Sequence, residues 1–298
     1  MSLLQRKSNP LDDLRVLKLI AQEAAGHFLS DGNRQTDGHR IINCAKYVRT
    51  YRTSSNDMFL DALYCKHPHC PLCQRQKARK YCSKTHQLLD QNPHLLHSKW
   101  VYLTLTIRDC NVDDLRPTAD RMTRAFQRLS SRRFWKDNVL GGVRFFEVTE
   151  SQIDSESVHP HFHCLLLVKP SMFAGNNYVS TAKWAKEWQQ ALQVYYEPKV
   201  HIERLSGEPD ELRGKIVGYS GYSMKHREKI LDRRRFLMMT HEMREFNRVQ
   251  PFGLIRSLFS ELDGQATFEA IAQLEEVRQS QEPFSLVWDG QTGIYRSD

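Results

Sequence analysis

Long hydrophobic runs are missing from this sequence of 298 residues, and no apolar stretch is long enough to cross a membrane as a helix. The first residues, MSLLQRKSNPLDDLRVLKL, place charges within every apolar stretch, so they lack the uninterrupted segment of a secretory signal. Internal repeats and low-complexity tracts are also missing. With a hydrophobic content of 40%, the sequence predicts a globular, cytoplasmic protein with one substantial core.

Cysteine is scarce, and its seven residues form an odd set that cannot pair completely within one chain, which fits a reducing compartment. The run CKHPHCPLC contains three of them, Cys65, Cys70 and Cys73, at spacings that approximate half of a zinc site. Cys44, about twenty residues upstream, can supply a fourth thiolate. The rivals for that place are His67, His69 and Cys82. This pattern predicts a structural zinc site.

Acidic residues are outnumbered, with 35 Asp and Glu against 43 Lys and Arg and a formal net charge of +8. One basic cluster follows the cysteine run: Arg75, Lys77, Arg79, Lys80 and Lys84. Another forms a stripe on the helix expected over residues 117–135: Arg121, Arg124, Arg128 and Arg132. Such clusters are either solvated helix faces or contacts to a polyanion. We expect the arginine stripe to contact a polyanionic partner.

Along the chain, segments whose apolar residues have the spacing of a strand are followed by segments whose apolar residues have the spacing of a helix. Residues 100–110 place Val101, Leu103 and Leu105 at every second position, as a half-buried strand does. Helices are expected over residues 11–29, 117–135, 176–192 and 214–230, and further strands over residues 142–150, 159–168 and 199–205. This order predicts an α+β fold in which helices flank a central, largely antiparallel sheet. From about residue 236 onward the sequence is helix-like.

Three histidines occupy alternate positions of the strand expected over residues 159–168. The imidazoles of His159, His161 and His163 therefore emerge from one face of that strand. Two such histidines can bind a divalent cation when a neighbouring strand adds a third ligand. Glu147 is the first candidate, because a carboxylate in its apolar surroundings is costly to bury without a partner, and Glu150 is the second. The pattern predicts a metal site, although it also resembles the histidine-triad nucleotide hydrolases.

The segment GKIVGYSGYSMKHREKI places three chemically active side chains at intervals of three residues. On a helix, Tyr219, Tyr222 and Lys225 lie along one edge. A phenol has a pKa of about 10, so it needs a nearby cation or metal before it can attack a phosphodiester. Lys225, one turn beyond Tyr222, supplies such a cation. Taken alone, this triplet is more often an interface tyrosine beside a solvated lysine.

Four segments, YLTLTIRDC, FFEVTE, HPHFHCLLL and YSMK, occur in the order found in the replication initiators of rolling-circle plasmids. The chain resembles that family, which belongs to the HUH endonuclease superfamily, over roughly residues 40–255. The resemblance implies that paired histidines bind Mg²⁺ or Mn²⁺ and that a tyrosine cleaves one DNA strand. Cleavage in that family leaves a 5′-phosphotyrosyl bond and a free 3′-hydroxyl. A histidine-triad hydrolase needs neither the cysteine cluster nor the downstream tyrosine.

The resemblance also assigns metal ligands residue by residue. His161 and His163 match the metal pair, and Glu147 matches the acidic position of the preceding strand. Related initiators have a cysteine in the region of Cys44, so the resemblance favours Cys44 as the fourth zinc ligand.

The catalytic element matches the family less completely. Tyr222 and Lys225 match its Tyr-x-x-Lys element. Some members carry a glutamate four residues before the tyrosine, whereas this chain has Gly218 there, or Lys215 if Tyr219 is the nucleophile. A role for Tyr219 as a second nucleophile is therefore an alternative route to termination.

The expected organisation has three regions: a helical and Cys-rich zinc-binding region over 1–98, the HUH endonuclease domain over 99–235 and a C-terminal helical extension over 236–298. The expected function is nicking and strand transfer at single-stranded or hairpin origin DNA, with Mn²⁺ or Mg²⁺ for catalysis and Zn²⁺ for structure. With DNA as the substrate that the resemblance implies, we expect the arginine stripe to contact its phosphate backbone. This role allows a host helicase as a further partner, and no membrane contact is expected. A transposase or conjugative relaxase would share the chemistry. A zinc-stabilised DNA-binding regulator with an inactive nuclease domain would lack it.

Overall fold

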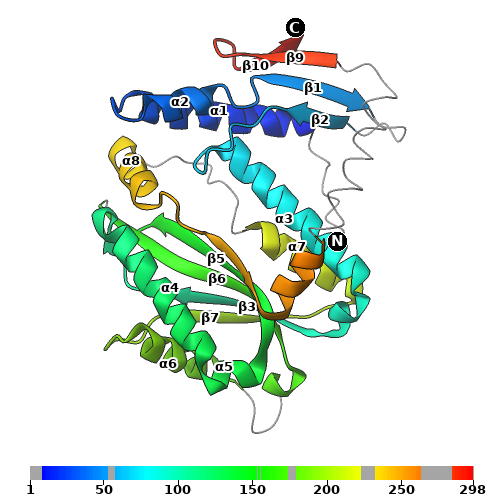
Figure 1. Ribbon diagram of the computed structural model, residues 1–298, viewed down its shortest axis with the longest axis vertical. Helices are drawn as coiled ribbons and strands as arrows, with labels where there is room; N and C mark the ends of the chain where they lie inside the picture. Colours follow the sequence, from blue (N-terminus) through cyan, green and yellow to red (C-terminus); the bar gives the residue numbers. More distant parts are fainter. Residues whose placement is uncertain are drawn as a thin grey trace. The chain divides into compact units, whose positions relative to one another are not determined.

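The computed structural model describes residues 9–52, 58–152, 154, 156–173, 179–222, 232–262 and 284–297 (Figure 1). The chain divides into two compact units. The first is drawn from residues 1–77, 226–237 and 265–298, and the second from residues 78–225 and 238–264. Each unit contains its own sheet.

In the second unit, six strands of the described residues form an antiparallel sheet. The strand order is β7, β3, β6, β5 and β8, and β4 pairs with β6. The bounds are Lys99–Thr106 (β3), Cys110–Asn111 (β4), Val139–Glu150 (β5), Ser157–Val168 (β6), Val200–Leu205 (β7) and Val249–Phe252 (β8). The strands expected from the sequence are confirmed, except that β3 ends at Thr106 and leaves Arg108 and Asp109 outside it.

Helices α4 (Leu115–Ser131), α5 (Arg133–Asn138) and α6 (Thr181–Leu192) lie on one side of this sheet (Figure 1). Their core combines alternate strand positions with helix residues: Val101, Leu103, Phe162, Leu166, Met122, Phe126, Trp184 and Trp188. Ser180 caps α6 by accepting from the Lys183 amide. The helix expected over residues 117–135 is interrupted at Arg132, whose extended backbone separates α4 from α5.

Helices α3 (Pro71–Gln91) and α7 (Pro209–Tyr222) contribute to the core on the opposite face, as do the helical residues 253–262. This layer buries the other set of strand positions together with helix residues: Trp100, Tyr102, Phe145, Leu165, Leu88, Leu212, Ile216 and Phe259. His161 and His163 alternate along β6 in step with Leu165, so they belong to the same face. The predicted tyrosine helix and the histidines therefore lie on one side of the sheet.

The first unit contains a four-stranded antiparallel sheet and the helices α1 (Pro10–Leu29) and α2 (Gln35–Ile42). Its strand order is β10 (Ile294–Ser297), β9 (Phe284–Asp289), β1 (Tyr47–Arg52) and β2 (Met58–Ala62). α1 confirms the helix expected over residues 11–29, and Asn9 caps it by accepting from the Leu11 amide. α8 (Arg233–Glu242) crosses the division between the units in sequence.

The expected helical character of the two ends of the chain is wrong in part. Strands β1 and β2 lie within residues 1–98, and β8, β9 and β10 lie within residues 236–298. In β9, Leu286 and Trp288 are buried at alternate positions, which is the period of a strand. Because β9 pairs with β1 near the other end of the sequence, no local sequence pattern could predict that these strands form one sheet.

The α+β architecture with antiparallel sheets and flanking helices is confirmed. The boundaries of the compact units differ from those of the three regions expected over 1–98, 99–235 and 236–298. Those regions divide the chain by expected function, and that functional division stays a prediction. Among the described residues, no helix combines the length and the apolar character needed to cross a membrane.

Candidate metal centre and active site

Glu147, His161 and His163 meet on the α7 side of the second unit's sheet. β5 and β6 are antiparallel, and their register places Glu147 directly opposite His161. Glu147 Oε2 lies 2.9 Å from His163 Nε2 and 3.4 Å from His161 Nε2, and the two Nε2 atoms are 3.0 Å apart. The structure thus brings together the three residues that the sequence proposed as ligands of one divalent cation.

Contacts behind the two imidazoles orient them. Thr104 of β3 is the register partner of His163 and places its Oγ1 3.1 Å from His163 Nδ1. His161 Nδ1 lies 3.1 Å from the carbonyl oxygen of His159. Because each Nδ1 has a partner, each ring presents its Nε2 towards Glu147. Partners of this kind fix ring orientation in metal sites.

Glu147 is ionised at neutral pH although its side chain is only 25% exposed. Burial raises the pKa of a carboxyl, but hydrogen bonds and charge from His161 and His163 outweigh it and lower the pKa of Glu147 to about 2. Two imidazole nitrogens and one carboxylate oxygen suit a transition-metal cation. A three-ligand set also leaves coordination positions for the oxygens of a substrate.

His159, the first histidine of the row, has a different partner. Its Nδ1 lies 2.6 Å from Asp109 Oδ1, and Asp109 also accepts a hydrogen bond from Ser151. Sequence patterns did not single out Asp109, because it follows the end of β3 and no spacing rule connects it to β6. The row therefore divides into two candidate ligands and one carboxylate-paired histidine.

Helix α7 places Tyr219 near the histidines through a stack of rings. The Tyr219 ring lies on Tyr102 with centroids 3.9 Å apart, and Tyr102 lies on His163 with centroids 5.3 Å apart. The Tyr219 hydroxyl donates to Glu203 Oε2 of β7 at 2.7 Å. Neither Tyr102 nor Glu203 stood out in the sequence, since each is an ordinary residue of its strand until the strands are paired.

The other proposed catalytic residues fall at the end of α7. Tyr222 is the last residue of the helix, and its side chain lies outside the described residues, as does Lys225. Gly218 and Lys215 precede the two tyrosines at the position where some family members have a glutamate. Lys215 Nζ donates to the Ser206 carbonyl oxygen at 2.6 Å, so it holds the start of its own helix.

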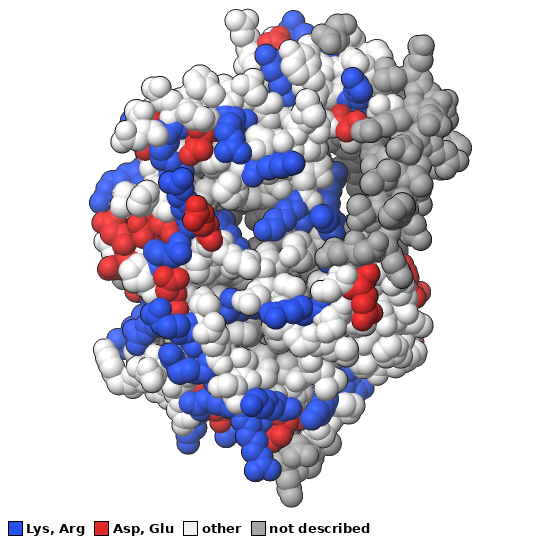
Figure 2. Space-filling view, in the orientation of Figure 1, with Lys and Arg blue, Asp and Glu red and all other residues white. Residues whose placement is uncertain are grey.

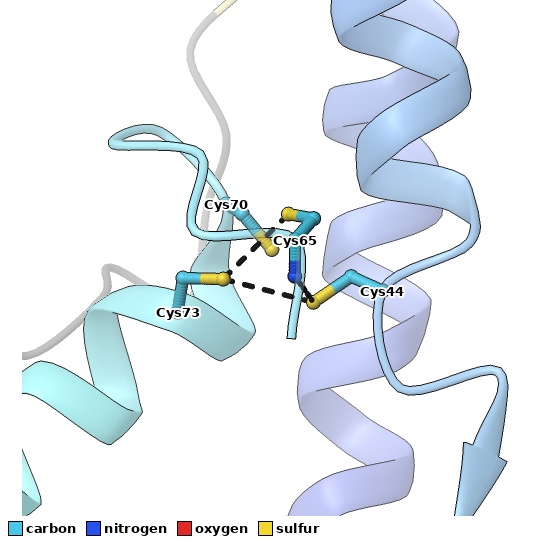
Figure 3. A group of neighbouring side chains, drawn as sticks. All are labelled: Cys44, Cys65, Cys70 and Cys73. Carbon is cyan, nitrogen blue, oxygen red and sulfur yellow. Dashed lines mark hydrogen bonds between the residues drawn. The ribbon is translucent and has the colours of Figure 1, made fainter. Parts of the chain in front are cut away.

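Four cysteines meet in the first unit (Figure 3). Cys73 Sγ lies 3.7 Å from Cys44 Sγ and 3.6 Å from Cys65 Sγ. Cys70 completes a group whose sulfurs all lie within 4.8 Å of one another. Four zinc–sulfur bonds of about 2.3 Å in a tetrahedron separate the sulfurs by roughly 3.8 Å. The cysteine group (Cys44, Cys65, Cys70 and Cys73) therefore fits a zinc ion.

The rivals for the fourth place do not join the cysteine group. His67 Nε2 lies 3.3 Å from Asp37 Oδ1. Cys82 donates to the Val217 carbonyl oxygen at 3.6 Å within the second unit. Neither of them nor His69 is among the four side chains whose ligand atoms converge.

A fully buried lysine lies beside the cysteine group. Lys18 of α1 is 0% exposed, and its Nζ donates to the carbonyl oxygens of Ile42, at 2.8 Å, and Cys44. Burial lowers the pKa of Lys18 to about 8, against the opposing influence of the nearby thiols. Helical periodicity did not single out this residue, because a lysine on a surface helix is usually solvated.

The arginine stripe of α4 belongs to the other side of the sheet from the histidines. Three of its members, Arg121, Arg128 and Arg132, donate to the C-terminal half of α6, and Arg128 Nε lies 2.7 Å from the Ala191 carbonyl oxygen. Arg124 is exposed. Figure 2 shows further Lys and Arg side chains over much of the face in view, with Asp and Glu in smaller groups. DNA contact by the stripe stays a prediction.

Comparison with known proteins identifies relatives for most of the chain. The family model described as "Replication protein" matches residues 56–296. "Protein rep" of Streptococcus pneumoniae serotype 2 is 34% identical over 212 residues, which is 70% of this chain and 66% of that protein. "Protein rep" of Lactiplantibacillus plantarum is 32% identical over 194 residues, covering 63% and 61% of the two chains. "Protein rep" of Bacillus amyloliquefaciens is 31% identical over 170 residues, covering 56% and 50%.

The matched part of the chain spans between half and two thirds of the length of these curated relatives. No solved structure matches the chain. The family match covers the cysteine run, the histidine strand and the tyrosine helix. The chain therefore belongs to the replication protein family, as its resemblance to the replication initiators of rolling-circle plasmids implied.

Proposed function

We propose that this protein initiates rolling-circle replication by nicking one strand of an origin and transferring that strand. The proposal rests on one observation: Glu147, His161 and His163 lie on the same side of the sheet as the tyrosine helix α7. Phosphodiester transfer by a tyrosine needs a cation site and a phenol held on rigid elements near each other. An inactive DNA-binding regulator would have no use for this grouping.

The chain's own residues divide the work. Glu147, His161 and His163 would hold Mn²⁺ or Mg²⁺, which when bound polarises a phosphate oxygen of the DNA strand. A tyrosine oxygen of α7 attacks the phosphorus, and the bond from phosphorus to the 3′ oxygen breaks. The phosphate stays joined to the tyrosine and to the 5′ oxygen of the downstream fragment, while the 3′ oxygen of the upstream fragment takes up a proton and can prime a polymerase. Attack by a 3′-hydroxyl on the phosphotyrosine reverses the step and transfers the strand.

Two tyrosines of α7 are candidates for the covalent bond. Tyr222 has Lys225 three residues later, and a cation there would stabilise the negative charge that gathers at the phosphate. Tyr219 has the described contacts, namely its stack on Tyr102 and the carboxylate of Glu203, which can accept its phenol proton. We assign nicking to Tyr222 and a second transfer to Tyr219.

Covalent trapping tests the proposal directly. The full chain is incubated with Mn²⁺ and labelled single-stranded origin DNA, and adducts that resist denaturation are counted and mapped by peptide mass spectrometry. We expect Tyr222→Phe to bind the DNA normally and form no adduct, and Tyr219→Phe to retain the first nick. Tyr47→Phe, in the first unit, is the matched control. Attachment to Tyr219 alone would reverse the assignment, and nicking without any adduct would defeat the tyrosine mechanism.

A further inference from the structure

A group of two tyrosines and one arginine, of which Tyr195 and Arg108 are exposed and Tyr196 is partly buried, lies just beyond the end of β3. The side chain of Tyr195 is 88% exposed, and that of Arg108 is also exposed. The Arg108 guanidinium lies 3.9 Å above the centroid of the Tyr196 ring. Its Nη1 donates to the Tyr195 hydroxyl at 3.0 Å. Tyr195 and Tyr196 meet edge to face, with centroids 5.7 Å apart. We call these three residues the Tyr–Arg platform.

The platform is fixed to the sheet rather than carried on a free loop. The Tyr196 hydroxyl accepts from the Arg108 amide at 3.1 Å, and the Tyr196 ring packs against the core. Thr106 Oγ1 donates to the Lys199 carbonyl oxygen at 2.8 Å, which ties the segment between Tyr196 and β7 to the last residue of β3. The Trp188 indole donates to the Thr106 carbonyl oxygen at 2.7 Å. The exposed Tyr195 ring is tied to this fixed group through the hydrogen bond from Arg108 to its hydroxyl, so it loses less conformational freedom when a ligand stacks on it.

The platform lies next to the candidate metal centre in the strand register. Thr106 is the partner of His161 across the β3–β6 ladder, and Arg108 follows two residues later. Asp109, the next residue, is bonded to His159. A strand of DNA that ran from the metal centre past the end of β3 would bring its flanking nucleotides to the platform.

We propose that the Tyr–Arg platform stacks an unpaired base of the single-stranded DNA that flanks the cleavage position. An exposed aromatic ring stacks on any base, and an adjacent guanidinium adds charge for a phosphate and a planar surface of its own. A base inside a duplex is already stacked on its neighbours and cannot use the ring. The platform thus selects single-stranded over double-stranded DNA without reading sequence. This inference rests on the proposed function, because it requires DNA at the metal centre.

Binding without cleavage tests the platform. Fluorescence anisotropy measures the affinity of the full chain for a labelled 20-nucleotide oligothymidylate and for a 20-base-pair duplex, without added Mn²⁺ or Mg²⁺. Since stacking on one aromatic ring accounts for about 5- to 100-fold in affinity, we expect Tyr195→Ala to weaken oligothymidylate binding by that factor and leave duplex binding unchanged. Tyr195→Phe keeps the ring and should bind within about twofold of the unmodified protein.

Arg108 and two matched controls sharpen the result. Arg108→Lys keeps the charge but loses the planar stack, so it should weaken single-strand binding more than Arg133→Ala, which removes an arginine of α5 that is 94% exposed. Tyr47→Ala removes an exposed tyrosine of the first unit that also has a lysine over its ring, and it should change nothing. Because Tyr195 is already exposed, Tyr195→Ala should unfold at the same urea concentration as the unmodified protein.

Photocross-linking of an oligonucleotide that contains 5-iododeoxyuridine supplies an independent readout, and we expect the cross-link at Tyr195. Equal binding of oligothymidylate by Tyr195→Ala and the unmodified protein, with no cross-link at Tyr195, would overturn the platform. Equal losses for single strand and duplex would overturn base stacking as its mode. If the covalent adduct fails to form but binding still depends on Tyr195, the proposed nicking is wrong and the platform stands. If the adduct forms but binding does not depend on Tyr195, the platform is wrong and the proposed nicking stands.

Discussion

The cysteine group and the Glu147–His161–His163 group could each hold a metal ion, but they differ in the number of ligands that they offer. The cysteine group offers four thiol sulfurs, which is enough to complete a tetrahedron around a zinc ion and would leave no position for a substrate. The second group has three ligands on two paired strands, which leaves positions open. A closed site serves structure and an open site serves catalysis. The two groups belong to different compact units, so we expect the two roles to be divided between those units.

Backbone conformation deepens this difference. Ala45 and Lys66, which directly follow Cys44 and Cys65, have φ values of 49° and 58°. Left-handed backbone costs a residue with a side chain roughly 1–2 kcal/mol, and it persists only where the surroundings impose it. The histidines and Glu147 lie instead on regular strands. We infer that the cysteine group would need a bound metal ion to keep its shape, whereas the sheet holds Glu147, His161 and His163 in place without one.

The largest effect should come from removing the ligands of the open site. The double variant His161→Ala, His163→Ala should lose Mn²⁺-dependent nicking by about 1,000-fold or more, because several kcal/mol of transition-state stabilisation disappear with the cation. Its circular dichroism and zinc content should match those of the unmodified protein. Glu150→Ala, on the same strand as Glu147 but outside the three-residue group, is the control and should nick normally. Undiminished cleavage by the double variant would remove the basis for an open catalytic site.

Removing a ligand of the closed site should have the next largest effect, on stability rather than on chemistry. Structural zinc sites contribute about 10–16 kcal/mol to the folding of small zinc modules, so Cys65→Ser should lose its zinc and leave the first unit sensitive to protease. Elemental mass spectrometry should find about one zinc per chain in the unmodified protein and in the Cys82→Ser control. Fully active protein without zinc would show that the cysteine group is not a metal site.

The smallest effect should come from replacing Lys18, whose ammonium group donates to the backbone carbonyl oxygens of Ile42 and Cys44 beside the cysteine group. Lys18→Met fills the same space but leaves two carbonyl oxygens, those of Ile42 and Cys44, without their donor. Each unsatisfied buried group costs about 1–3 kcal/mol, so the free energy of unfolding should fall by a few kcal/mol. Zinc should also pass to a competing chelator faster. Lys46→Met, a nearby lysine that is only partly buried, should change neither quantity, and equal zinc release by both variants would deny Lys18 this role.

The sequence predicted those parts of the molecule in which neighbours along the chain are also neighbours in space. Alternation along 159–168 placed His161 and His163 on one face, and the single carboxylate in an apolar run identified Glu147 as their partner. The spacing of Cys65, Cys70 and Cys73 likewise belongs to a single short run.

The features that the sequence could not predict depend on pairing between distant segments. Glu203 approaches Tyr219 only because β7 pairs with β3 and α7 packs over that edge of the sheet. Asp109 reaches His159 across the end of a ladder. Lys18 looks like a solvated helix residue until α1 packs against the segment that carries Cys44. In each case the deciding contact is tertiary, and helical or strand periodicity carries no information about it.

The pairing of β1 with β9 fixes an order of events during synthesis. All residues of the second unit precede Phe284, so they leave the ribosome before β9 exists. At about 5–20 residues per second, the stretch between Arg52 and Phe284 takes roughly 10 to 50 seconds to make, and β1 waits that long for its partner. The sheet of the second unit can therefore form on the nascent chain while the sheet of the first unit is still incomplete. A substitution that disrupts β9 at Leu286 would also remove the pairing partner of Val48 in β1, although the two residues lie near opposite ends of the sequence.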